Sequence, residues 1–338
     1  MAAIASRLAR VRLQFAQRRT WALLLLAVVA VLYPYLVRPY HLSLAIEVLI
    51  FAIFAMSLDI LLGYTGLVSF GHAAFFGLGA YLVAYTTIGL TNNLAVTLPV
   101  VVVGTALAAL VAGFFAIRTS GIYFLMVTLA FAQMLFSIAI RWSSVTGGSD
   151  GLSGVSRPAI GVGPLSYTFD SRTSFYYLVL AFFLLSWWVL RRIVDSPFGW
   201  TLRGIRENEQ RMLALGYNTF RYKMAAFVIA GVFAGIAGML LAQFFRHAAP
   251  ENLYWTTSGQ VMIMLIVGGT GTLTGPILGA AVIRLLPNYL STYTDRWQTV
   301  LGLTFILFVL FAPQGIMGLI QRFRQRGERR EHSENRTS

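Results

Sequence analysis

Long apolar runs dominate the chain, and alternation of apolar and polar residues at a period of two is absent. One crossing of a bilayer takes about 20 apolar residues in a helix, whereas a membrane β-barrel needs alternating strands. The pattern therefore predicts an all-α integral membrane protein. Candidate spans lie at 22–37, 43–62, 70–88, 94–117, 119–140, 174–194, 223–245 and 297–319.

A further apolar block, 258–290, does not fit a single span. As one helix it would be roughly 50 Å long, well beyond a hydrocarbon core of about 30 Å. It also contains VGGTGTLTGP at 267–276, which a regular helix interior does not tolerate. We expect two short crossings here and about ten transmembrane helices in all, some short or broken. A re-entrant pair, giving eight, is the alternative.

Charge is sparse and unevenly placed. Charged residues make up 11% of the chain, the hydrophobic ones 57%, and the net charge is +14. Eighteen of the 26 Lys and Arg residues lie in 1–20, 191–223 and 321–338. Short basic loops and tails mark the cytoplasmic side and attract anionic lipid, so the charge does not indicate a nucleic-acid partner. An even number of spans between these stretches puts both termini in the cytoplasm.

The same pattern gives the expected organisation of the chain. The run that begins at Trp21 has no small-residue cleavage site after it, and we interpret it as a retained first span. A second external connection, 246–257, is shorter than the Gly-, Ser- and Pro-rich one at 141–173. The domains are a basic cytoplasmic tail at 1–20, a transmembrane domain at 21–320 with an inner loop at 195–222 and a periplasmic loop at 141–173, and a basic cytoplasmic tail at 321–338.

Two glycine-punctuated breaks, 63–71 and 268–276, interrupt apolar runs. Non-helical backbone at membrane depth is tolerated where it is buried in protein or lines a wet cavity, and transporters use such breaks at their substrate sites. The breaks therefore predict a lined pathway. Tight turns at the membrane interface, with glycines for close packing, are the alternative.

Ionisable groups inside spans are costly and often functional. Glu47 and Asp59 both lie near predicted helix ends, where water is near, and they point about 120° apart, which disfavours a proton relay. Arg284 could pair with either acid. The lone His72 is expected to be a packed or helix-capping group rather than a metal ligand. The small residues of GVFAGIAG at 231–238 predict close helix packing, within the subunit or across a dimer.

The inner loop carries a predicted amphipathic helix at 200–215, with a start signal at Ser196–Pro197 and a stop at Gly216. Leu202, Ile205, Met212, Leu213 and Leu215 could face the membrane or a partner. Glu207, Asn208 and Glu209 form an acidic and amide cluster inside a basic loop, which favours a specific partner surface over an inert connection.

Several enzyme classes are excluded. The chain has no cysteine, no GxSxG, no HExxH and no Walker lysine motif, and its only lysine is Lys223. We therefore expect no catalytic residue, metal or cofactor, and no ATP hydrolysis by this chain.

Six stretches resemble one family. GYTGLVSFGHAAFFGLGAY (63–81), SGIYFLMVTLAFAQML (120–135), VTGGSDGLSGV (145–155), RENEQRMLALGYNTFRYKMAAFVIAG (206–231), VGGTGTLTGPILGA (267–280) and LFAPQGIMGL (310–319) are similar to LivM-type permeases of branched-chain amino acid ABC importers. The similarity runs in order over roughly 43–320. It implies an importer-permease fold in the bacterial inner membrane and a pathway for leucine, isoleucine and valine.

The resemblance also implies partners and roles. A second related permease would complete a heterodimer, with two cytoplasmic ATP-binding subunits and a periplasmic binding protein. The inner loop would couple to the ATPases, through Arg206, Glu207, Asn208, Glu209, Arg211 and Gly216. Hydroxyls and backbone amides at the breaks would offer dipoles to a zwitterion. The expected pathway residues are Thr65, Gly66, Ser69, Gly71, His72, Gly268, Gly269, Thr270, Gly271, Thr272 and Thr274.

Three alternatives remain at this point. A permease for urea or short amides would look much the same, because the binding protein selects the substrate. An ion-coupled secondary transporter would work alone, without nucleotide. An integral membrane enzyme acting on lipid would need a converging site, for which His72 and Asp59 are the candidate pair.

Overall fold

In the computed structural model, residues 29–161 and 167–293 are described, together with 296, 299–300, 302–303, 305–306, 310 and 315–319. Helices account for most of these residues, and residues 29–36 are also helical. The long helices are α2 (Pro39–Asp59), α3 (His72–Gly89), α4 (Leu94–Ala116), α5 (Ile122–Arg141), α7 (Arg172–Val194), α10 (Thr219–Phe245), α11 (Trp255–Gly268) and α12 (Thr274–Tyr293). The short elements are the π-helix η1 (Ile60–Thr65), α6 (Ser143–Thr146), η2 (Gly148–Asp150), β1 (Leu152–Ser153), β2 (Ala159–Ile160), β3 (Tyr167–Thr168), α8 (Pro197–Glu207), α9 (Glu209–Ala214), β4 (His247–Ala248) and η4 (Pro250–Leu253).

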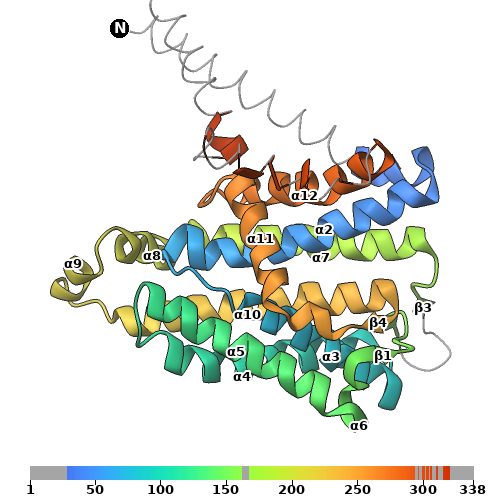
Figure 1. Ribbon diagram of the computed structural model, residues 1–338, viewed down its shortest axis with the longest axis horizontal. Helices are drawn as coiled ribbons and strands as arrows, with labels where there is room; N and C mark the ends of the chain where they lie inside the picture. Colours follow the sequence, from blue (N-terminus) through green and yellow to red (C-terminus); the bar gives the residue numbers. More distant parts are fainter. Residues whose placement is uncertain are drawn as a thin grey trace, which may run out of the picture.

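The bundle is elongated, with different structures at its two ends. Figure 1 shows α8 and α9 at one end of the long axis and β1, β3 and β4 at the other, with the long helices running between them. We call these the α8 end and the β1 end. The predicted inner loop and the two predicted external loops therefore lie at opposite ends of the molecule.

Five helices are long and apolar enough to cross a membrane: α2 with η1, α4, α5, α7 and α10. Their bounds agree with the predicted spans to within four residues, the largest differences being the earlier starts of α2 and α10. A helix at 72–89 matches the expected span at 70–88. The expected spans at 22–37 and 297–319 lie only partly within the described residues, and residues 29–36 of the first are helical.

The block at 258–290 forms two helices rather than one. Residues 269–273 join α11 to α12, and Gly269, Gly271 and Leu273 adopt positive φ values of 108°, 74° and 54° in this turn. Residue 288 of α12 lies beside Tyr40 at the start of α2, and Gly271 lies beside the end of α2. α12 therefore runs antiparallel to α2.

Backbone contact between α3 and α10 holds the centre together. A Cβ at Gly238 would lie 1.7 Å from the Phe76 carbonyl oxygen, and one at Gly79 would lie 2.1 Å from that of Gly235. Any larger residue would separate the helices, so glycine is required at these crossings. The small-residue pattern at 231–238 thus packs within the chain, one of the two expected alternatives.

The β1 end joins the two predicted external loops. β1 pairs with β4 in antiparallel register, Leu152 opposite Ala248 and Ser153 opposite His247. A second short ladder pairs β2 with β3, Ala159 opposite Thr168. These ladders satisfy backbone groups in loops that have no helix to do so.

Candidate functional site: the junction of the two helix breaks with α8

The first break begins later than the sequence suggests. The helix continues through η1 to Thr65, and Gly66 ends it in a left-handed conformation with φ 77°. In the wide π-turn, the Thr65 hydroxyl donates to the Ile60 carbonyl at 2.8 Å, and the Leu67 amide donates to Leu61 at 2.9 Å. π-turns are frequent at functional sites. The non-helical segment is therefore 66–71, close to the α8 end.

His72 begins α3 and is fully buried. Its Nε2 lies 2.8 Å from the Ser57 hydroxyl, and its ring stacks on Phe54 with centroids 5.4 Å apart. The next amide, of Ala73, donates to the Ser258 hydroxyl of α11 at 2.8 Å. His72 is thus a packed polar group at a helix start. It does not share its partners with Asp59, so these two residues form no converging pair.

The second break is held by the carboxylate of Asp59. Its Oδ1 accepts from the Gly271 amide at 2.7 Å and its Oδ2 from the Leu273 amide at 3.1 Å. The side chain is completely buried, which corrects the expectation that water lies near it. Gly63, one turn further along, leaves room for this contact, because a Cβ there would lie 2.0 Å from Asp59 Oδ1. Asp59 therefore joins the two breaks directly.

Arg206 of α8 enters the same junction. Its Nη1 donates to the Gly63 carbonyl, and its aliphatic stem lies 3.1 Å from where a Cβ on Gly66 would be. A Cβ on Gly271 would lie 3.4 Å from Nη1. We call this contact between α2, the 269–273 turn and α8 the Asp59 junction. Its members are Asp59, Gly63, Arg206, Gly271 and Leu273.

The inner loop contains two helices, which corrects the single helix expected at 200–215. Asn208 breaks the helix with extended backbone, φ −160° and ψ 99°, and its side chain accepts from the Arg211 amide at 2.9 Å. The polar Asn208 favours a new N-cap over a helix interior, which explains the break. Leu202 and Ile205 of α8 are buried in the chain, whereas Leu213 and Leu215 are exposed.

The exposed part of the loop carries most of the expected coupling residues. Glu207, Asn208 and Arg211 are exposed, and Gly216 ends α9 with φ 86°. Glu209 is partly buried because it pairs with Lys223 of α10 at 2.5 Å. The loop is thus attached to the bundle at both sides, by Arg206 and by Glu209, and its tip is free for contact.

The expected pathway residues fall into two groups. Thr65, Ser69, Gly71, His72, Gly268 and Gly269 are buried inside the bundle. The other five border or face open space: Gly66 and Thr270 are exposed, and Gly271, Thr272 and Thr274 line a cavity of about 380 Å³ with Tyr64, Arg191 and Asp195. The hydroxyls of Thr272 and Thr274 bond to backbone carbonyls, at 3.0 Å and 3.3 Å. Whether these residues line a pathway stays a prediction.

Sequence reasoning singled out Glu47 and Arg284 as ionisable groups inside spans, but not Gln260 or the cavities that these residues share. Arg284 borders three cavities, and Glu47 borders two of them. The signal was present as helical spacing, since residues 40, 43 and 47 and residues 284 and 288 recur every three or four positions. Gln260 of α11 borders two of the same cavities.

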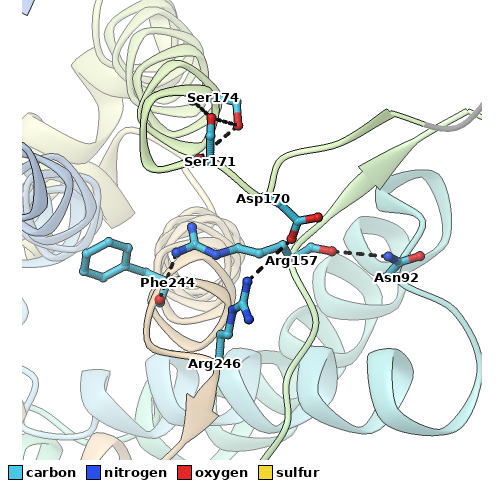
Figure 2. A network of polar contacts seen from close by, with 7 residues as sticks. All are labelled: Asn92, Arg157, Asp170, Ser171, Ser174, Phe244 and Arg246. Carbon is cyan, nitrogen blue, oxygen red and sulfur yellow. Dashed lines mark hydrogen bonds and ion pairs between the residues drawn. The ribbon is translucent and has the colours of Figure 1, made fainter. Parts of the chain in front are cut away.

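At the β1 end, Arg157 ties the long external loop to the bundle, as Figure 2 shows. Its guanidinium lies 4.2 Å from the Phe175 ring centroid and donates to the Phe244 carbonyl at 3.4 Å. Arg246 pairs nearby with Asp170 at 3.5 Å. Burial, and next Arg246, lower the pKa of Arg157 to about 10, so it remains charged at neutral pH. The network fixes the loop rather than offering a reactive group.

Among the described residues, no group of three or more His, Cys, Asp or Glu lies close enough together to hold a metal ion. The ionisable groups of the Asp59 junction bond to backbone amides and carbonyls instead. What this arrangement provides is a mechanical link between a surface helix and two interrupted helices.

Comparison with known proteins gives a consistent picture. The chain is 27% identical over 314 residues to the LivM permease protein of a high-affinity branched-chain amino acid transport system from Salmonella typhimurium, covering 87% of this chain and 74% of that protein. A probable LivM permease from Methanocaldococcus jannaschii is 24% identical over 294 residues, 76% of this chain and 83% of that protein. LivH of Escherichia coli is 29% identical over 125 residues, 36% of this chain and 40% of LivH.

No solved structure matches the chain. The family model described as the permease component of branched-chain amino acid transport systems matches residues 40–312, which include both helix breaks, α8 and α9. The chain is therefore a multi-pass, all-α membrane protein that belongs to this family of permease components.

Proposed function

We propose that this chain is a transmembrane permease subunit of an ATP-driven importer and forms part of the pathway for leucine, isoleucine and valine. The relatives that carry the LivM name support the substrate class. The observation that carries the mechanism is the contact of Arg206 with the first break, because α8 then touches the interrupted backbone directly.

The expected assembly follows from the same comparisons. Because the chain resembles both LivM and LivH relatives, a second, related permease is its natural partner. Two ATP-binding subunits would dock on the exposed tip of α9, where Leu213, Leu215 and Tyr217 are exposed beside charged residues. A periplasmic binding protein would deliver the substrate at the β1 end.

Orientation follows from charge. The α8 end carries the basic residues of 191–223 and would lie in the cytoplasm of a bacterial inner membrane. Ten crossings would then place both termini in the cytoplasm. The domain limits remain the tails at 1–20 and 321–338, the transmembrane domain at 21–320, the periplasmic loop at 141–173 and the coupling loop at 195–222.

In the proposed mechanism, α8 and α9 act as a lever that transmits movement of the ATP-binding subunits to the two helix breaks. Closure of the ATP-binding subunits would move α9 and α8 together, because Asn208 joins them and Glu209 anchors α9 to Lys223. Arg206 would carry that movement to Gly63, and Asp59 would carry it on to the 269–273 turn. The two breaks would thus shift as one unit and act as the gate at the cytoplasmic end, with Thr270, Gly271, Thr272 and Thr274 at its mouth.

ATP-driven uptake of radiolabelled leucine into proteoliposomes tests the proposal. The complete importer is expected to accumulate leucine only with ATP and the liganded binding protein. Urea and acetamide should not compete with leucine for uptake. If they compete, the substrate is a short amide and not a branched-chain amino acid. Uptake by this chain alone without nucleotide would refute the importer subunit and favour an ion-coupled transporter.

Arg206→Ala tests the lever within the same assay. It removes the donor to Gly63 while leaving the exposed tip of α9 unchanged, so the importer should assemble and hydrolyse ATP while leucine uptake falls about tenfold or more. Arg221→Ala, at an exposed position at the start of α10 and outside the expected coupling residues, is the matched control for loss of an arginine. Equal loss of hydrolysis and uptake in Arg206→Ala would show a docking role instead.

A further inference from the structure

A second polar site lies in the helical region, away from the Asp59 junction. Glu47 of α2, Gln260 of α11 and Arg284 of α12 come from three helices that meet along one side of the bundle. Arg284 borders three adjoining cavities of about 200, 260 and 440 Å³. The largest falls within the roughly 300–1,000 Å³ that small-molecule sites occupy.

Arg284 is held in place but incompletely satisfied. Its guanidinium carbon lies 3.4 Å from the centroid of the Phe51 ring, a cation–π contact that fixes the plane of the group. Its Nε is buried and has no hydrogen-bond partner among the described residues. A buried donor on a charged group without a partner is costly, so such a group is normally paired. The missing partner has to be an acceptor, and a carboxylate matches the guanidinium fork best.

Glu47 supplies the opposite charge across open space. It borders the 260 and 440 Å³ cavities together with Arg284, and the two groups attract each other electrostatically. Within the described residues, however, no ion pair within 4.0 Å joins them. A zwitterion would fit the space that the two groups border, with its carboxylate toward Arg284 and its ammonium toward Glu47.

The third cavity is apolar. Besides Gln260 and Arg284, its lining consists of Ile263, Met264, Ile283, Pro287 and Phe305. It adjoins the charged cavities at Arg284, so an aliphatic side chain could enter it while the charged groups of the same molecule stay at Arg284 and Glu47.

We propose that Glu47, Arg284 and this apolar cavity form a binding site for a zwitterionic amino acid with an aliphatic side chain. The inference rests on the proposed transport function and adds to it the place where the permease holds its substrate. The gate at the α8 end and the substrate site are then different parts of the chain. A purely structural Glu47–Arg284 pair would give the site no ligand, and the experiments below separate the two roles.

Thiol protection tests binding directly. The chain has no native cysteine, so Gln260→Cys introduces one labelling site in this chain at an exposed position bordering two of the cavities. In the assembled importer, millimolar leucine should slow labelling of this cysteine by a charged thiosulfonate reagent at least about threefold. Thr256→Cys, exposed and one turn earlier in α11 but outside the cavity linings, is the matched control and should label equally with and without leucine.

Chemical analogues and second-site variants identify the groups that bind. Leucinamide, which lacks the carboxylate, and 4-methylpentanoate, which lacks the ammonium group, should protect poorly. Adding Arg284→Gln or Glu47→Gln to Gln260→Cys should raise the leucine concentration for half-protection about tenfold or more, the effect of one lost hydrogen bond to a charged group. Unchanged protection in both variants overturns the proposal.

Uptake by the complete importer separates this site from the proposed function. Arg284→Lys keeps the charge but loses the fork, and should reduce leucine uptake about tenfold while stimulation of ATP hydrolysis by the liganded binding protein persists. If Arg284→Lys and Arg284→Gln both take up leucine as the parent does, the proposed binding site is wrong, whereas the proposed importer function is unaffected. If the parent importer does not take up leucine, the proposed importer function is wrong. If Arg284→Gln fails to assemble while Arg284→Lys assembles and transports normally, the residue is structural and the proposal is wrong.

Discussion

The face formed by α4 and α5 and the face where α2, α11 and α12 meet are both helical and both span the bundle, yet their chemistry differs. Residues 94–117 and 122–140 contain no charged residue, and their exposed side chains are apolar, such as Val103, Leu107 and Phe115. The second face carries Glu47 and Arg284 beside cavities.

This difference in chemistry indicates which face of the bundle contacts lipid. Hydrocarbon tolerates exposed Val, Leu and Phe, whereas charged groups in a membrane face a protein interior or a water-filled cavity. The α4–α5 face therefore suits contact with lipid, and the other face suits a pathway or a partner permease. Variants on each face would test this assignment, in addition to those of Arg206 and Arg284.

The largest effect is expected for a charge on the apolar face. Leu107→Arg places a guanidinium near the middle of α4, where its insertion into hydrocarbon costs about 3 kcal/mol. The yield of assembled importer in the membrane should fall severely, as measured by immunoblot of purified complexes. Leu107→Met is the matched control and should assemble normally. Normal assembly of Leu107→Arg would mean that protein or water, not lipid, covers this face.

A smaller but clear effect is expected for Asp59. Asp59→Ala leaves the buried amides of Gly271 and Leu273 without an acceptor, which costs about 2 kcal/mol or more. The midpoint of thermal unfolding of the purified complex should drop. Asp59→Asn keeps the shape of the side chain and one acceptor oxygen, so the drop in its unfolding midpoint should be about half as large. If both variants unfold at the same temperature as the parent, the Asp59 carboxylate does not hold the 269–273 turn.

The smallest effect is expected for the hydroxyls of the first break. Thr65→Val with Ser69→Ala removes two side-chain hydrogen bonds to nearby backbone, worth about 1 kcal/mol each. Leucine uptake should fall about two- to threefold, with assembly and ATPase docking intact. Unchanged uptake would exclude the hydroxyls of Thr65 and Ser69 from the pathway.

The residues of the Asp59 junction were only partly recognisable from the sequence. The breaks at 63–71 and 268–276 stand out because glycine is rare inside helices, and the family resemblance placed Arg206 in the coupling loop. Their meeting did not, because Asp59 and Gly271 are 212 positions apart and only the packing of α2 against the 269–273 turn joins them. The break of the inner helix at Asn208 was likewise hidden, since the polar residues around it suit either one helix or two.

The sequence alone was enough to identify the class of protein and the approximate bounds of the long helices within the described residues. These follow from the length and charge of local segments, which set the cost of transfer into lipid. Only the tertiary structure decided that α8 touches both helix breaks and that Glu47, Gln260 and Arg284 share one set of cavities. Such contacts depend on how separate helices pack, and a local pattern does not fix that.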